Sequence, residues 1–193
     1  MITCPLALSV LPTTPMPQDL RSSLWLVPQP ADTGALQCMI CKLAQEHGGT
    51  PFAPHLTLLG GLSAPRQALV DRAALLAAAL DPITLRPLSV DGEQSRFRCL
   101  YIRFAHSCQL DSARCRAESV MPPSVGAFLP HMSLYYGRLE TAGRLQLARS
   151  IILHLPAAIT LDRLAVADTS KAVEDWDEIA VFRLGSWSGR NRR

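Results

Sequence analysis

The sequence predicts an α+β protein whose sheets are largely antiparallel and in which one lobe is present in two copies. Expected strands and helices alternate along the chain, but short hairpin-like connections between them argue against a doubly wound parallel sheet. One short motif occurs twice, each time at the start of a strand that precedes a helix. The 193 residues are enough for a single domain or for two small lobes that share a core.

Three regions are expected along the chain. Residues 1–22 are an irregular N-terminal extension, because their several prolines cannot donate to a strand ladder. Residues 23–185 hold all of the expected strands and helices and form the domain. Residues 186–193 are polar and basic and form a frayed C-terminal tail.

Turn residues and hydrophobic spacing define the elements of the first half. Apolar runs stopped by proline or glycine predict strands, and apolar residues at helical spacing behind a capping residue predict helices. In chain order, these elements are a strand Ser23–Val27, a helix from Asp32 or Thr33 to Gly48–Gly49, a strand His55–Leu59 closed by Gly60–Gly61, and a helix from Ser63 or Pro65 to about Leu80.

The second half follows from the same signals. The turn-rich segment Asp91–Glu93 separates its first two strands. The expected elements are strands Ile83–Val90 and Cys99–Phe104, a short helix Asp111–Ser119, a loop through Pro122, Pro123 and Gly126, a strand His131–Tyr136, a helix Thr141–Leu155, and closing strands Ile159–Val166 and Glu178–Leu184.

The composition indicates a folded protein with a small ligand. Hydrophobic residues make up 48% of the chain and charged residues 18%, which excludes intrinsic disorder. A net charge of +3 is too small for a long nucleic acid partner or a polybasic membrane anchor, but it suits a small anion. The apolar run Ile2–Val10 is short and contains Pro5, so we expect no signal peptide and no membrane helix. We expect a cytoplasmic monomer.

The six cysteines are too sparse for a disulfide scaffold. Cys38 and Cys41 form a CxxC, but no second pair lies at zinc-ribbon spacing, and we expect both to be small buried hydrophobes of a helix. One disulfide among Cys99, Cys108 and Cys115 is compatible with their spacing, although reduced thiols are the default expectation.

The repeated motif reads Phe-x-Pro-His-apolar-hydroxyl-Leu. Its two copies are Phe52–Leu58 and Phe128–Leu134, and His55 and His131 lie 76 residues apart. Because strand side chains alternate between faces, His55 and Thr57 share one face and His131 and Ser133 share another. A pseudo-two-fold relation between the lobes would bring both pairs to a common cleft.

Two imidazoles and two hydroxyls in one cleft fit phosphodiester cleavage. One neutral imidazole takes a proton from water while an imidazolium protonates the leaving oxygen, and histidine does both near neutral pH. Thr57 and Ser133 can donate to the non-bridging phosphate oxygens. A single strand histidine is more often a packing residue, but two copies in matched contexts favour catalysis.

Neither a metal nor an organic cofactor is expected. Two imidazoles without an acidic third ligand make a poor zinc site, and the chain contains no HExxH motif. The glycine-rich loops that cradle nucleotide phosphates, GxGxxG and Walker-type, are also missing from the sequence.

The two His-x-Thr/Ser motifs resemble those of the two-histidine phosphoesterase superfamily, and within it the plant and yeast cyclic phosphodiesterases. The likeness covers roughly Ser23 to Leu184. The stretches that carry it are Ser23–Pro28, Phe52–Thr57, Pro130–Tyr136 and Trp176–Val181. The N-terminal extension, the C-terminal tail and the cysteines between Cys108 and Gly126 depart from the family pattern, so no disulfide is carried over.

The resemblance implies a bilobal fold with an antiparallel sheet and outer helices in each lobe around a central cleft. It implies metal-independent hydrolysis of ADP-ribose 1″,2″-cyclic phosphate, left over from tRNA splicing, and of nucleoside 2′,3′-cyclic phosphates to the 2′-phosphate. His55 and His131 would be the acid–base pair, with His131 as the base and His55 as the acid. Thr57 and Ser133 would bind the phosphate. Tyr136 would lie near it, although its strand parity requires it to reach the cleft from the strand's end.

Two aromatic residues are candidates to stack on a nucleobase. Trp25 is as readily explained as a core residue of its strand. Phe97 lies between Arg96 and Arg98, and strand alternation would put both arginines on the opposite face. A phosphate contact from either arginine is conceivable, but solvated charge is the expected role.

Three functions follow as hypotheses. The first is a metal-independent cyclic phosphodiesterase whose partner is a small nucleotide cyclic phosphate. The second is an RNA-end or 2′-5′ phosphodiesterase of the same superfamily, against which the low net charge argues because long RNA needs a basic groove. The third is a non-catalytic nucleotide-binding protein, which would bind the product without turnover.

Overall fold

The computed structural model describes residues 21–124 and 127–185. The predicted C-terminal tail, Gly126 and residues 1–20 of the predicted N-terminal extension lie outside these described residues. The strands are β1 (Arg21–Pro28), β2 (Leu56–Ser63), β3 (Ile83–Leu85), β4 (Pro87–Asp91), β5 (Leu100–Phe104), β6 (His131–Tyr135), β7 (Ile159–Asp168) and β8 (Asp177–Arg183). The helices are α1 (Pro30–His47), α2 (Arg66–Ala79), α3 (Cys108–Val120) and α4 (Thr141–Ile151), with 3₁₀ turns η1 (Arg96–Arg98), η2 (Ile152–His154) and η3 (Val173–Asp175).

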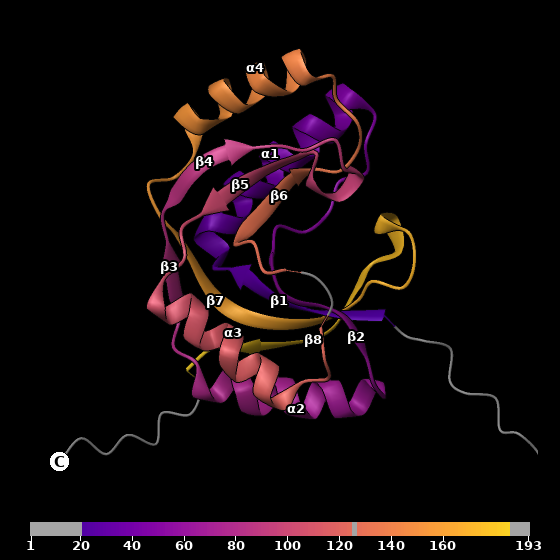
Figure 1. Cartoon of the computed structure of the whole chain (residues 1–193), viewed down its shortest axis with the longest axis vertical. Coiled ribbons are helices and arrows are strands. Elements are labelled where there is room, and N and C mark those ends of the chain that lie inside the picture. The colour runs from indigo at the N-terminus through magenta and orange to yellow at the C-terminus, as the bar shows by residue number, and fades with distance from the viewer. Residues whose placement is uncertain (1–20, 125–126, 186–193) are drawn as a thin grey trace, which may run out of the picture.

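The strands within the described residues form one sheet in which every neighbouring pair is antiparallel. The order is β3-β7-β1-β2-β6-β5-β4, and β8 also pairs with β7 (Figure 1). The predicted α+β class with an antiparallel sheet is therefore confirmed.

The two strands that carry the repeated motif are direct neighbours in the middle of this sheet. β2 and β6 meet at one register pair, Leu56 opposite Met132, and this pair joins the two halves of the sheet. One half consists of β1, β2, β3, β7 and β8, and the other of β4, β5 and β6. Leu56 and Met132 are fully buried, so the residues on either side of them face the opposite surface of the sheet.

The helices cover the outer face of the sheet, and two of them cross from one half to the other. α1 follows β1 but packs on β6, and α3 follows β5 but packs on β2. α2 packs on β7 and β8, and α4 packs on β4. α1 and α4 thus cover the half of the sheet formed by β4, β5 and β6, at one end of the molecule. α2 and α3 cover the other half, at the opposite end (Figure 1).

The sheet is curved strongly enough that its two edges nearly meet. The predicted strand Ile83–Val90 is wrong, because the structure divides it into β3 at one edge of the sheet and β4 at the other. Arg86 alone links them, and consecutive Cα atoms are only about 3.8 Å apart. A local apolar run cannot distinguish one strand from two short ones that pair with different partners. The curvature leaves a concave inner face opposite the helices.

Two further predictions about local structure are wrong. β2 does not end at Gly60–Gly61 but continues to Ser63, because pairing with β1 extends it. Cys38 and Cys41 are exposed, since the buried face of α1 is formed by Leu36, Ile40, Leu43 and Ala44. Its predicted end is confirmed: Gly48 caps α1 at a φ of 71°, which glycine adopts readily.

The five cysteines at positions 38, 41, 99, 108 and 115 are all free thiols, and Cys99 is buried. No disulfide links Cys99, Cys108 and Cys115. In the described part of the chain, no helix has the length and apolar character needed to cross a bilayer.

Candidate active site

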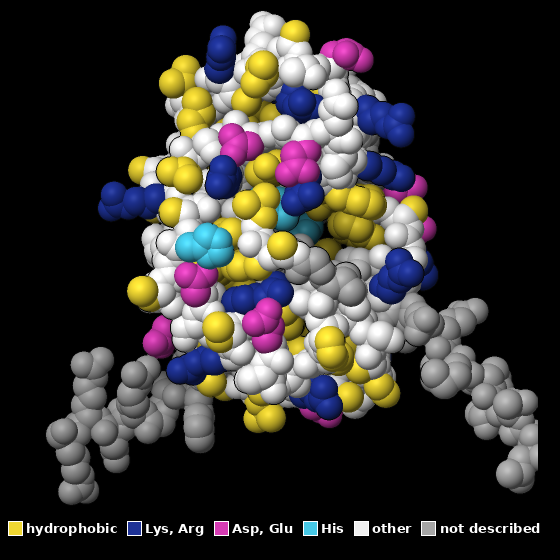
Figure 2. Space-filling view, viewed as in Figure 1, with side chains coloured by type: hydrophobic (Ala, Val, Ile, Leu, Met, Phe, Trp, Pro, Cys, Tyr) yellow, Lys and Arg dark blue, Asp and Glu magenta, His cyan; other side chains and the backbone are white. Residues whose placement is uncertain are grey.

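A cavity of about 370 Å³ opens on the concave face, where the two halves of the sheet meet. All seven residues that the sequence singled out as candidate site residues line it, together with five others. The lining residues are Ser23, Trp25, His55, Thr57, Ser95, Phe97, Arg98, His131, Ser133, Tyr136, Thr169 and Trp176. Figure 2 shows a histidine at the bottom of a hollow in the middle of this face, among hydrophobic and charged side chains.

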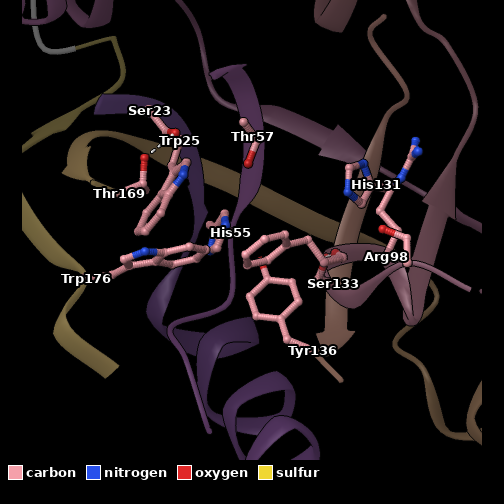
Figure 3. Close-up of a pocket in the computed structure, with 12 residues that line it drawn as sticks. Ser23, Trp25, His55, Thr57, Arg98, His131, Ser133, Tyr136, Thr169 and Trp176 are labelled. Atoms are coloured by element: carbon pink, nitrogen blue, oxygen red, sulfur yellow. Dashed lines mark hydrogen bonds between the residues drawn. The ribbon is translucent and has the colours of Figure 1, made fainter. Parts of the chain in front are cut away.

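The register of β2 and β6 brings the two motifs face to face. Because Leu56 lies opposite Met132 in an antiparallel pair, Thr57 lies on the side of His131 and His55 on the side of Ser133 (Figure 3). Each imidazole therefore faces the hydroxyl residue of the other copy. The four side chains alternate with buried leucine and methionine, and all four point into the cavity.

The two imidazoles are held in the same way. His55 Nδ1 lies 2.7 Å from the carbonyl oxygen of Ala53, and His131 Nδ1 lies 2.8 Å from that of Leu129. A carbonyl oxygen only accepts, so Nδ1 carries the proton and donates in both rings. Nε2 is then left to accept a proton or, once protonated, to donate one. The hydrogen bond thus selects the tautomer that acid–base chemistry at Nε2 requires.

Burial lowers the pKa of both histidines. The pKa of His55 falls to about 4, because burial disfavours the charged ring, while the Ala53 carbonyl opposes this effect and the nearby His131 adds to it. The pKa of His131 is also lowered by burial, and the Arg98 guanidinium lowers it further. The Leu129 carbonyl and Glu93 oppose that shift. At neutral pH, His55 is therefore neutral.

The two hydroxyl groups are in different states. Ser133 is buried, and its Oγ donates to the carbonyl oxygen of Phe97 at 3.1 Å, which ties β6 to η1. Among the described residues, the Thr57 hydroxyl has no hydrogen-bond partner. Thr57 can therefore donate to a bound anion at once, whereas Ser133 must first leave the Phe97 carbonyl.

Tyr136 enters the cavity from just beyond the end of β6, as its strand parity predicted. Its ring stacks on Phe52, with ring centroids 3.9 Å apart and planes 17° apart. Burial raises the pKa of Tyr136 far above its usual value, while a hydrogen bond with the Ser133 side chain opposes this shift. The phenol is thus a neutral O–H group beside Ser133.

Arg98 is the one cationic side chain that lines the cavity in the described part of the chain, apart from the titratable histidines. Its Nη2 lies 3.0 Å from Glu93 Oε2, and the Tyr101 hydroxyl donates to Glu93 Oε1 at 3.4 Å. The expectation that Arg96 and Arg98 share one strand face is wrong, because η1 is a 3₁₀ turn. The turn separates them and places Phe97 and Arg98 together in the cavity.

Aromatic rings also line the cavity. Trp25 is 3% exposed, and His55 covers one of its faces, with ring centroids 3.8 Å apart. Phe97 is 49% exposed, and its ring is nearly parallel to that of Trp176, with centroids 6.1 Å apart and planes 19° apart. Phe97 and Trp176 therefore offer a base more accessible surface than Trp25 does.

Five lining residues were not among the predicted site residues. Trp176 and Ser23 belong to stretches that carry the family resemblance, but nothing in their spacing predicts a place in the cavity. Ser23 and Thr169 lie 146 residues apart in the sequence, and their hydroxyls are 3.0 Å apart where β1 pairs with β7. Such long-range neighbours leave no local pattern. Within residues 21–124 and 127–185, no three His, Cys, Asp or Glu side chains are grouped as a metal site would need.

No protein-family model and no curated protein matches the sequence. Several solved structures do resemble the fold. LigT of E. coli in its apo form is 17% identical at a TM-score of 0.54, and the match covers 87% of this chain and 99% of LigT. LigT complexed with 3′-AMP is 18% identical at a TM-score of 0.55, with 86% and 99% covered. TT0787 of Thermus thermophilus is 17% identical at a TM-score of 0.57, with 86% and 98% covered. The chain therefore has the same fold as LigT and TT0787.

Proposed function

We propose that this protein is a metal-independent phosphodiesterase that opens ribose cyclic phosphates. Its substrates would be nucleoside 2′,3′-cyclic phosphates, hydrolysed to 2′-phosphates, and ADP-ribose 1″,2″-cyclic phosphate. The observation that carries the proposal is that His55 and His131 face two hydroxyl groups in one cavity. In each histidine, Nδ1 is hydrogen-bonded to a backbone carbonyl oxygen. This arrangement provides two proton-transfer groups and several phosphate donors.

The reaction needs one base and one acid. A neutral Nε2 takes a proton from water as the water oxygen bonds to phosphorus. The bond from phosphorus to the 3′-oxygen breaks, and the protonated imidazole gives its proton to that oxygen, which leaves the 2′-phosphate. The family resemblance suggests His131 as the base and His55 as the acid. Because burial lowers the pKa of His55 to about 4, that role requires His55 to gain a proton as the anionic substrate binds.

The phosphate would be held by donors from both halves of the cavity. Thr57 has a hydroxyl ready to donate, and Ser133 and Tyr136 supply two further O–H groups. Arg98 supplies a positive charge next to His131. Donors aimed at the non-bridging oxygens stabilise the charge that develops on them in the transition state.

The size and walls of the cavity favour a small nucleotide. A volume of about 370 Å³ lies at the lower end of the range for small-molecule sites. Phe97 and Trp176 would stack on the base, which gives affinity with little base preference. In support, structures of E. coli LigT have been solved in complex with 3′-AMP, ATP and NADP+.

Hydrolysis of 2′,3′-cyclic AMP in EDTA tests the proposal, with the product identified by phosphorus NMR. We expect turnover to the 2′-phosphate and a loss of about 10²-fold to 10⁴-fold in kcat for His55→Ala and for His131→Ala. His106→Ala is the matched control, because His106 is an exposed histidine paired with Asp111 and does not line the cavity. Absence of turnover, or activity unchanged in both cavity variants, would refute the proposal.

The same assay separates the alternatives. Faster turnover of an oligonucleotide with a cyclic end than of the mononucleotide would favour an RNA-end phosphodiesterase. Binding of the 2′-phosphate product without any turnover would favour a nucleotide-binding protein.

A further inference from the structure

A second cavity, of about 360 Å³, adjoins the proposed active site at Tyr136. Tyr136 lines both cavities. Arg96 lines the second cavity and is followed in η1 by Phe97, which lines the first. A ligand bound between the histidines would thus have the second cavity beside it.

The second cavity is lined by two permanent cations. Arg96 and Arg138 are among its lining residues, and no Asp or Glu is among them in the described residues. Within that part of the chain neither Arg96 nor Arg138 forms an ion pair, whereas Arg98 on the other side of Phe97 is bonded to Glu93. Arg96 and Arg138 also line a neighbouring hollow together with Glu93 and Glu140, but neither of these carboxylates forms an ion pair with them in the described residues. The Arg96 guanidinium carbon lies 5.6 Å from the centroid of the Phe97 ring, and no described carboxylate neutralises either guanidinium, so both can bind an anion.

The floor of the cavity is closely packed around Tyr135. The Tyr135 hydroxyl donates to the carbonyl oxygen of His47 at 2.8 Å, which joins β6 to the end of α1. Gly49 and Gly137 lie against the Tyr135 ring, and a Cβ at either position would lie within 2.7 Å of it. The Gly137 N–H donates to the carbonyl oxygen of Arg96 at 3.0 Å, which holds the backbones that bear Arg96 and Arg138 together.

We propose that this second cavity binds a second phosphate of the substrate, one attached through the 5′-oxygen of the same ribose. The inference rests on the proposed function. When the 2′- and 3′-oxygens carry the reacting cyclic phosphate, the 5′-oxygen is the ribose position left for another phosphate. The preferred substrates are then nucleotides with a phosphate on the 5′ side, and bare nucleoside cyclic phosphates are poorer ones.

Product affinity tests this without turnover. Calorimetry at fixed pH and ionic strength would compare adenosine 2′,5′-bisphosphate with adenosine 2′-monophosphate. Two arginines on one phosphate predict about a tenfold lower Kd for the bisphosphate, since charge-assisted hydrogen bonds are strong ones. A dinucleotide ending in a 2′-phosphate carries the same group as a diester and shows whether a chain phosphate is also accepted.

The expected result is that Arg96→Gln/Arg138→Gln brings the ratio of the two Kd values close to one. Arg72→Gln/Arg149→Gln is the matched control: it removes the same two charges from exposed sites on α2 and α4 that do not line either cavity, and it should leave the ratio unchanged. Equal affinities in the unmodified protein, or a ratio that survives the double substitution, would overturn the inference. If 2′,3′-cyclic AMP is not hydrolysed but the ratio behaves as expected, the catalytic proposal fails and the second phosphate site stands.

Discussion

Trp25 and His55 form a stacked pair at the base of the cavity, with ring centroids 3.8 Å apart and planes 14° apart. Trp25 lies on β1, where it pairs with Thr57 of the next strand. Its strand neighbours Leu24 and Leu26 face the main core, so Trp25 itself faces the concave surface. The indole thus excludes water from one face of a proposed catalytic imidazole.

Trp25→Ala is expected to raise the pKa of His55 from about 4 toward the ordinary value of 6.5, because water would reach the ring. We also expect kcat/KM to fall on the order of 10-fold to 100-fold as the ring loses its fixed orientation. An NMR titration of the His55 ring measures the first effect. Trp25→Phe keeps part of the cover and should show a smaller shift. An unchanged His55 pKa in Trp25→Ala would show that the indole does not set it.

Thr57 and Ser133 should respond differently to loss of their hydroxyls. Thr57→Val removes a group without a protein partner in the described part of the chain, so binding of the 2′-phosphate should weaken by about tenfold with little change in stability. Ser133→Ala removes a buried hydroxyl together with its hydrogen bond to the Phe97 carbonyl oxygen and should lower the free energy of unfolding by about 1 kcal/mol. Urea denaturation and calorimetry on both variants check this. Equal stability losses would contradict the asymmetry.

The buried His55 should make stability depend on pH. Its folded-state pKa of about 4 lies below the unfolded value of 6.5, so the unfolded chain binds more protons between these values. The stabilisation that His55 contributes is therefore fully present above pH 6.5 and is lost as the pH falls to about 4. This lowers the free energy of unfolding by about 3 kcal/mol. Urea denaturation at several pH values should show a shallower dependence in His55→Gln. His131, whose pKa is also lowered, would account for part of what is left.

Gly137 should not tolerate a side chain. A Cβ there would lie 2.6 Å from Tyr135 Cε1, inside van der Waals contact, and overpacking of this kind costs about 1 to 3 kcal/mol. Gly143 lies in α4 with nothing within 4 Å of its Cβ position, so Gly143→Ala should be stabilising by about 0.5 to 1 kcal/mol. Thermal denaturation compares the two. A stabilising Gly137→Ala would mean that the Tyr135 ring moves freely.

Much of the molecule could be predicted from short segments. The spacing of Leu36, Ile40 and Leu43 predicts α1, and Gly48 predicts its end, because helical periodicity and the left-handed cap are local properties. Strand alternation likewise predicts that His55 and Thr57 share a face. The edges of the sheet could not be predicted, since the division of Ile83–Val90 into β3 and β4 depends on which distant strands they pair with.

By itself, the sequence determined the class of fold, the duplicated motif and the four polar residues it carries, because period-two alternation and a fixed-offset repeat are visible along one dimension. Only the tertiary structure decided what surrounds them. The single pair of Leu56 with Met132 sets which hydroxyl faces which imidazole, and η1 turns Arg98 inward and Arg96 toward the second cavity. The stacking of Trp25 on His55 likewise depends on the pairing of β1 with β2. These contacts join segments far apart in the chain, and long-range pairing, not local spacing, creates them.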